Sequence, residues 1–261
     1  ESEVTLEFVD SKGQAIRKFS SRPPEKEPEI DALKETIVRA EAGMNRFIWN
    51  MRHPSARPIP GAEEVEKALA GPIVPPGEYQ VRLTVEDMVQ TQSFELVLDP
   101  RITASTNDLE EQCSLLIRIR DRLSEIHDAV GTIRSLKQQI DEWVARAEGS
   151  EAQGTVVEAA DGFKGRLAAV EEELIQVKSD GENDGLHFPS RLNRKLAELA
   201  SAPASADAAP TQQAYDVFDD LSARVEVQLR KLQYLIDTDL ATFINLVHEM
   251  KIPAVVPNRA R

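Results

Sequence analysis

Cysteine, aromatic residues and basic charge are all scarce in this sequence. One cysteine among 261 residues excludes an internal disulfide and a cysteine-based zinc cluster. Aromatic residues make up 5% of the chain, which is low for an all-β protein and ordinary for one built from long helices. Acidic residues number 45 and basic residues 31, and the net charge of −14 argues against binding to nucleic acid or to an anionic membrane surface. No apolar run approaches the roughly 20 residues of a membrane-spanning helix.

Apolar residues, by contrast, make up 41% of the chain, so we expect a folded protein with a real core. The sequence begins at Glu1 with neither an initiator methionine nor a signal-peptide pattern. From this beginning we expect a piece or a processed product of a longer protein. Residues 254–261 are basic and without a hydrophobic pattern, and we expect them to form a flexible tail.

Alternating apolar and polar residues predict β-strands in the first part of the chain. One pair of alternating segments, 4–9 and 15–19, is separated by a glycine-containing turn and predicts a hairpin. A second pair, 79–85 and 94–98, predicts another hairpin. Short strands with turn signals between them are typical of an antiparallel sandwich of the immunoglobulin or fibronectin type.

A further strand is predicted at residues 45–50, with Phe47 and Trp49 on one face. We expect Trp49 and Tyr79 to fill the core rather than to stack on a ligand, because both lie on the inward phase of their strands. The fold class that follows is α+β with two domains, of which residues 1–101 form an Ig-like β-sandwich.

Residues 102–253 predict long helices. Ser105 or Thr106 can cap the first helix, which runs for roughly 40 residues to Ala147. Its heptad pattern has two apolar seams. The first is broken by Lys137 and consists of Leu109, Leu116, Leu123, Val130 and Val144. The second is made of isoleucines and ends in alanine: Ile119, Ile126, Ile133, Ile140 and Ala147. Further helices are predicted over three segments: 156–178, 190–200 and 211–250. Pro253 ends the last of them.

The economical way to bury these seams is an antiparallel bundle of three or four helices within the chain. The alternative is that one seam pairs with another chain. Lys137 and Asp239 fall on seam positions, where they would weaken a long uniform coiled coil, so we favour the intramolecular bundle.

No pattern of residues predicts a catalytic, cofactor-binding or metal site. The four histidines lack the i, i+4 spacing and the His-Glu-x-x-His pattern of helical zinc sites. Asp180–Gly185 is similar to the start of a calcium loop, but Arg191 stands where a bidentate glutamate is needed, so we interpret it as a polar turn. The prolines of Gly71–Gly77 remove the N–H donors that a phosphate loop uses. Cys113 lies beside the helical seam, and we expect it to be a small residue of the core.

Several longer segments resemble a known family. They are AGMNRFIWNMRHP, GPIVPPGEYQVRLTV and QSFELVLDPR in the first part, and LHFPSRLNRKLAELAS with APTQQAYDVFDDL in the second. Together they are similar to the C-terminal region of bacterial sortilin-like, glycosyl-hydrolase-like β-propeller proteins with BNR (Asp-box) repeats. In that family a small Ig-like sandwich of the flagellar hook-capping type and a helical segment follow the propeller.

The resemblance covers about residues 4–255, but the propeller itself is missing, since no Asp-box repeat occurs here. Catalytic residues of the family would lie in that missing part, so none is carried over. The resemblance implies a non-catalytic C-terminal accessory module of a larger exported protein, with an extracytoplasmic location, periplasmic or secreted. Its expected partners are the preceding propeller and a protein, or a second copy, bound through the helices. The alternative is a carbohydrate-binding module attached to a glycan-degrading propeller.

Overall fold

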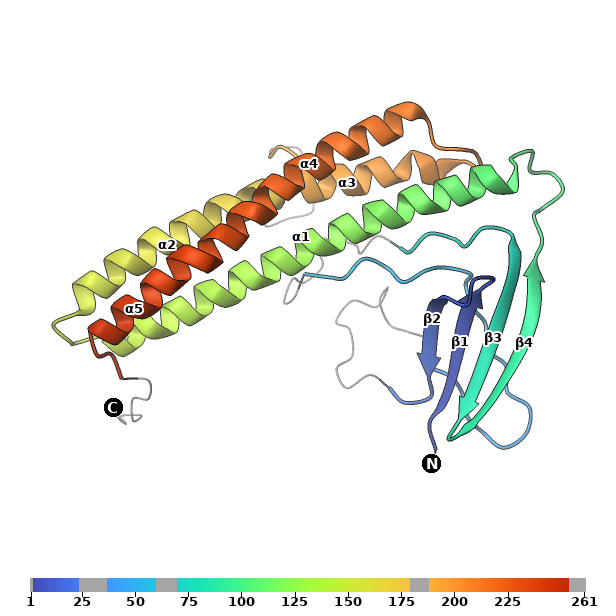
Figure 1. The fold of residues 1–261 in the computed structure, drawn as a ribbon, viewed down its shortest axis with the longest axis horizontal. Coiled ribbons are helices and arrows are strands. Elements are labelled where there is room, and N and C mark those ends of the chain that lie inside the picture. Colours follow the sequence, from blue (N-terminus) through green and yellow to red (C-terminus); the bar gives the residue numbers. More distant parts are fainter. Residues whose placement is uncertain (1, 24–36, 60–69, 179–187, 254–261) are drawn as a thin grey trace. The chain divides into compact units, whose positions relative to one another are not determined.

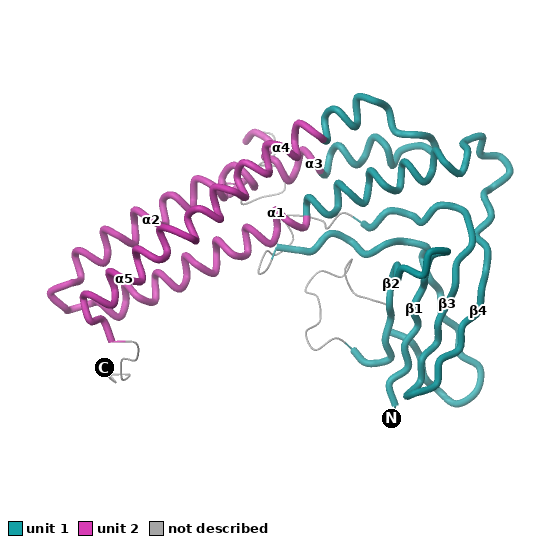
Figure 2. The backbone as a smooth tube through the Cα atoms, in the orientation of Figure 1, with its two compact units in different colours: residues 1–123, 197–218 teal, residues 124–196, 219–261 magenta. Residues whose placement is uncertain are grey.

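The computed structural model describes residues 2–23, 37–59, 70–178 and 188–253, and it has the α+β composition expected from the sequence (Figure 1). The chain divides into two compact units (Figure 2). The first unit contains residues 1–123 and 197–218, and the second contains 124–196 and 219–261. The predicted tail, the candidate calcium turn and His187 lie outside the described residues. The predicted domain boundary at Arg101 stays a prediction.

The first unit contains a four-stranded antiparallel sheet in the order β2-β1-β3-β4. Its strands are β1 (Val4–Asp10), β2 (Ala15–Ser20), β3 (Gly77–Val85) and β4 (Met88–Leu96). Both predicted hairpins are therefore confirmed. In the first turn the Asp10 carboxylate accepts hydrogen bonds from the backbone N–H groups of Lys12 and Gln14. Gly13 adopts a left-handed φ of 81°, which glycine takes without a steric penalty.

The strand predicted at residues 45–50 does not form, and the described residues contain one sheet rather than the two of a sandwich. The alternation is nevertheless real, since Phe47 and Trp49 pack against the core cluster of Phe8 while Ile48 is exposed. The segment covers the sheet with its aromatic side chains instead of pairing with a strand. Period-two alternation reports which side chains are buried and does not show whether the backbone is paired.

Aromatic rings dominate this core. Trp49 stacks on Phe8 with 4.2 Å between ring centroids, and Tyr79 stacks on Phe94 at 5.9 Å. Tyr79 is 6% exposed and Trp49 is half-buried. The predicted core roles of Trp49 and Tyr79 are confirmed.

Helices make up most of the remaining described chain. They are α1 (Thr106–Ala147), α2 (Gln153–Leu174), α3 (Leu192–Ser201), the 3₁₀ turn η3 (Pro203–Ser205), α4 (Gln212–Tyr234), the π-helix η4 (Leu235–Leu240) and α5 (Ala241–Glu249). At the start of α1 the Ser105 hydroxyl accepts a hydrogen bond from the Asp108 N–H, and the Asp108 carboxylate accepts one from the Ser105 N–H. This reciprocal cap confirms the predicted helix start. The predicted isoleucine seam of α1 is fully buried from Ile119 to Ala147.

In the second unit α1 and α2 run antiparallel. Arg134 and Lys137 on α1 both bind Glu171 on α2, at 2.9 and 2.6 Å, whereas Asp141, further along α1, binds Lys164, earlier on α2. The lysine that interrupts the predicted seam thus has an internal partner. Asp239, the other polar seam residue, is likewise paired with Arg166 of α2. Internal partners at both seam positions favour helices that pack within the chain.

The last predicted helix, 211–250, is interrupted by the π-helix η4, whose buried residue is Leu235. A π-turn adds a residue to the helical turn, which shifts the phase of the stripe that follows. Phe243 and Val247 are nevertheless buried beyond it, and Phe243 follows the buried Val225 by 18 residues, which is five turns of a regular helix.

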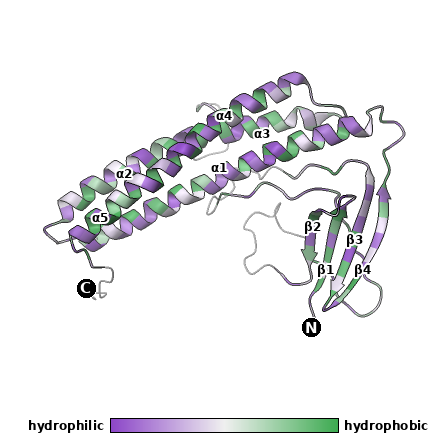
Figure 3. Cartoon of the chain, in the orientation of Figure 1, coloured by the Kyte–Doolittle hydropathy of each residue, from purple (hydrophilic) through white to green (hydrophobic). Residues whose placement is uncertain are grey.

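The part of the chain that the structure describes contains no helix long and apolar enough to span a bilayer. Hydrophilic residues recur along each long helix (Figure 3).

Candidate functional site

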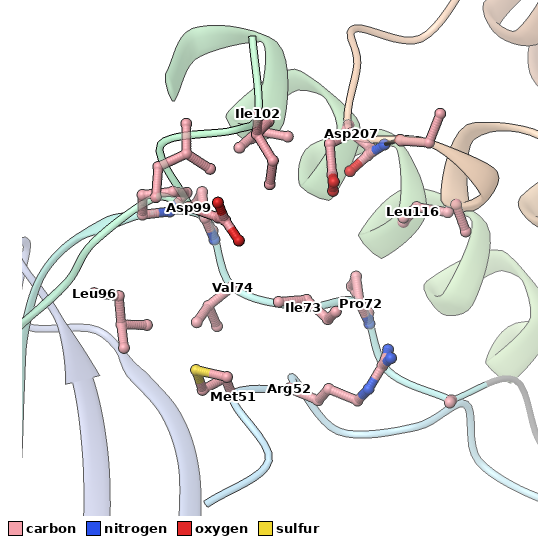
Figure 4. A pocket seen from close by; sticks show the side chains of 18 of the residues that line it. Met51, Arg52, Pro72, Ile73, Val74, Leu96, Asp99, Ile102, Leu116 and Asp207 are labelled. Atoms are coloured by element: carbon pink, nitrogen blue, oxygen red, sulfur yellow. Dashed lines mark hydrogen bonds between the residues drawn. The ribbon is translucent and has the colours of Figure 1, made fainter. Parts of the chain in front are cut away.

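The first unit contains an open cavity of about 520 Å³. Loops beside the sheet supply residues 51–52, 70–76 and 96–99, and the helical side supplies residues of 102–116 and 200–207 (Figure 4). Ligand-binding cavities in proteins span roughly 300–1,000 Å³ and have mostly apolar walls with a few polar groups. The size and the lining of this cavity agree with that description, so we consider it the candidate site.

Two segments that cross closely build one wall. The His53 N–H donates to the Pro72 carbonyl oxygen at 2.9 Å, and the Val74 N–H donates to the Met51 carbonyl oxygen at 2.9 Å. A Cβ at Gly71 would overlap the backbone carbonyl of His53. Only glycine therefore allows the two backbones to approach this closely.

Side chains anchor the same wall to the aromatic core. The Arg52 guanidinium donates to the Gly71 carbonyl oxygen at 2.9 Å, and the Tyr79 hydroxyl donates to the Pro75 carbonyl oxygen at 2.6 Å. Burial raises the pKa of Tyr79 to about 12, so its hydroxyl stays a donor over the physiological range. The proline-rich segment between residues 71 and 76 is thus held at both ends.

The walls carry large apolar side chains that are left open to solvent. Met51, Ile73 and Val97 are 44%, 54% and 79% exposed. Met51 also has a left-handed φ of 56°, a conformation that costs energy for a residue other than glycine. Exposed apolar groups and backbone strain at one cavity are both features that binding sites show more often than ordinary surface.

The charged groups of the cavity are mostly engaged with the protein itself. The Asp99 carboxylate accepts hydrogen bonds from the side chain and the backbone N–H of Arg101, and these bonds lower the pKa of Asp99. Gln112 of α1 donates to the carbonyl oxygens of Pro203 and Ala206, which ties α1 to the segment around η3. Figure 4 shows the carboxylates of Asp99 and Asp207 beside apolar lining residues. The arrangement suits contact with an apolar group better than acid–base chemistry.

The other residues considered from sequence lie apart from this cavity or within the core. Cys113 is buried, which confirms the predicted core position, and burial raises the pKa of its thiol to about 11. Burial, with the charge of Arg120 as a smaller cause, lowers the pKa of His53. Within the described ranges no group of three or more histidine, cysteine or acidic residues could hold a metal ion.

Sequence reasoning missed the cavity. The Gly71–Gly77 segment drew attention only as an unsuitable phosphate loop, although its prolines and Ile73 supply much of the wall. The signal in the sequence was a glycine followed by prolines and apolar residues within one short segment.

No protein-family model, no curated protein and no solved structure matches the chain. The resemblance to the C-terminal region of sortilin-like propeller proteins therefore remains an expectation from the sequence.

Proposed function

We propose that this chain is a non-catalytic binding module whose cavity in the first unit receives an apolar group of a partner. The observation that carries the proposal is the cavity itself, where Met51, Ile73 and Val97 expose apolar surface. Arg52 and Asp99, two charged residues of the lining, are held by Gly71 and Arg101. Because these two charged side chains already form hydrogen bonds within the protein, the proposal rests on apolar contact with the partner.

The resemblance adds a context to this proposal. The module would follow a β-propeller in a larger exported protein, periplasmic or secreted. An Ig-like sandwich would connect the propeller to an antiparallel helical bundle, and the helices would offer a further surface for a protein or a second copy. The antiparallel contacts of α1 with α2 support the bundle, whereas the sandwich still lacks a second sheet among the described residues.

The alternative of a carbohydrate-binding module has less support. It needs exposed aromatic rings that can stack on sugars. Tyr79 is buried and Trp49 is stacked on Phe8, so both rings contribute to the core. A glycan array that returned a specific ligand would nevertheless favour this alternative.

Nile red titration tests the proposed cavity, because this neutral apolar dye becomes fluorescent when it leaves water. We compare Ile73→Ser with Ile48→Ser, since both isoleucines are exposed, at 54% and 67%, and only Ile73 lines the cavity. We expect Ile73→Ser to weaken dye binding about fivefold to tenfold, because it removes roughly 1 kcal/mol of apolar contact. Ile48→Ser should bind as the parent chain does. Equal losses in the two variants, or no saturable binding at all, contradict the proposal.

A further inference from the structure

A second concave surface lies in the second unit, between α2 and α4, and we call it the α2–α4 groove. Its volume is about 490 Å³. The lining residues used below are Arg166, Val170, Val227, Arg230, Lys231 and Tyr234.

Apolar side chains form both the floor and one edge of the α2–α4 groove. Val170 of α2 is buried at its floor. Val227 and Tyr234 of α4 are 47% and 65% exposed. They are seven residues apart, so they lie on the same face of the helix, about 10 Å from one another along its axis. This spacing matches two turns of an apolar stripe on a facing helix.

The charged residues that line the α2–α4 groove are opposite in sign to the net charge of the chain. All three charged residues of its lining, Arg166, Arg230 and Lys231, are basic, while the whole chain has a net charge of −14. Asp239 pairs with Arg166, and Glu226 pairs with Arg230 at 3.0 Å across an exposed helix surface. Lys231 is exposed and forms no ion pair with a described residue. Arg230 and Lys231 fall between Val227 and Tyr234 on the same face of α4, so this face is complementary to an amphipathic segment that carries both apolar and acidic residues.

We propose that the α2–α4 groove binds an acidic amphipathic helix of a partner protein. Apolar residues of that helix, spaced one and two turns apart, would contact Val227, Tyr234 and the floor. Its flanking carboxylates would pair with Arg230 and Lys231. Tyr234 is the expected anchor, because tyrosine concentrates binding energy at interfaces. The net charge of the chain disfavours an anionic membrane as the alternative occupant.

The proposal goes beyond the cavity of the first unit, and its test is independent of the Nile red titration. The probe is a fluorescein-labelled synthetic amphipathic helix of about 18 residues, with leucines on one face and glutamates flanking them. Its binding to the full chain is followed by fluorescence anisotropy. The control peptide has lysine in place of every glutamate.

The variants are Lys231→Glu and Tyr234→Ser, and the matched control is Lys178→Glu. Lys178 is exposed, lies outside the groove lining and changes the net charge by the same amount. We expect Lys231→Glu to weaken binding of the glutamate peptide about fivefold to tenfold and Tyr234→Ser to weaken it at least about tenfold. Lys178→Glu should change the affinity less than about twofold. Unchanged circular dichroism establishes that each variant is folded.

Several results overturn the proposal. Equal binding of the lysine peptide removes the charge argument, and equal losses in Lys178→Glu and Lys231→Glu remove the groove. Saturable binding to phosphatidylglycerol vesicles without binding to the peptide assigns the surface to lipid. A dimer in light scattering that both groove variants dissociate assigns it to a second copy of this chain.

Discussion

The ion-pair network around Glu171 allows a quantitative prediction about the second unit. Its carboxylate lies on α2 with 8% of its side chain exposed, and it accepts hydrogen bonds from Arg134 at 2.9 Å and Lys137 at 2.6 Å. Replacement of Glu171 by alanine removes the acceptor of both cations. The two cations then remain beside an apolar seam with no counter-charge at this position.

The expected cost follows from the burial of the cations. Breaking a fully buried ion pair by removing one partner costs about 3–5 kcal/mol, because a charge is left uncompensated. Here the side chains of Arg134 and Lys137 are 39% and 26% exposed, so each can turn partly toward water. We therefore expect Glu171→Ala to lower the free energy of unfolding by about 2–3 kcal/mol.

Urea denaturation followed by circular dichroism measures this loss, and Glu173→Ala is the matched control. Glu173 lies on the same helix and pairs with Arg191 at 3.4 Å, but its side chain is 50% exposed. An exposed pair contributes at most about 1 kcal/mol, so the control should lose less than that. A loss below about 0.5 kcal/mol in Glu171→Ala, or equal losses in the two variants, would refute the reasoning about buried charge.

Removal of the carboxylate together with its closest cation sharpens the test. Glu171→Leu combined with Lys137→Leu places two apolar side chains where one ion pair was, and replacement of a buried pair in this way is often neutral or stabilising. Arg134 loses the same carboxylate, but its side chain is 39% exposed and can turn toward water. The double variant should therefore be more stable than Glu171→Ala. If it were also less well defined in oligomeric state, as light scattering would show, the ions would serve to specify packing within the chain.

Two further predictions concern the wall of the cavity. Gly71→Ala should lower the free energy of unfolding of the first unit by at least about 2 kcal/mol, because a Cβ at this position overlaps the His53 backbone. Urea unfolding followed through Trp49 fluorescence, in a Trp143→Phe background, measures this loss. A neutral result contradicts the close crossing of the two segments. Burial raises the pKa of Tyr79 to about 12, so the stability that its neutral form supplies is complete below about pH 10 and is lost as the pH rises toward 12. The urea midpoint should fall between about pH 9 and pH 11 by more in the parent chain than in Tyr79→Phe; equal falls contradict burial as the cause.

Local patterns in the sequence were sufficient to locate the two hairpins and the first long helix. Alternation located both hairpins, and the heptad spacing located α1 with its isoleucine seam, because side-chain period depends on neighbouring residues of one segment. The same reasoning failed at residues 45–50. Whether an alternating segment pairs with a strand depends on the backbone of a different segment.

The sequence alone also determined the acidic charge, the single cysteine and the polar interruptions of the helical seams at Lys137 and Asp239. Only the tertiary structure decided that these two residues pair with Glu171 and Arg166 of α2. The tertiary structure likewise decided the cavity of the first unit, because its walls come from segments that are far apart in the chain. Ion pairs and cavities require two segments to meet at one place, and no local period specifies where distant segments meet.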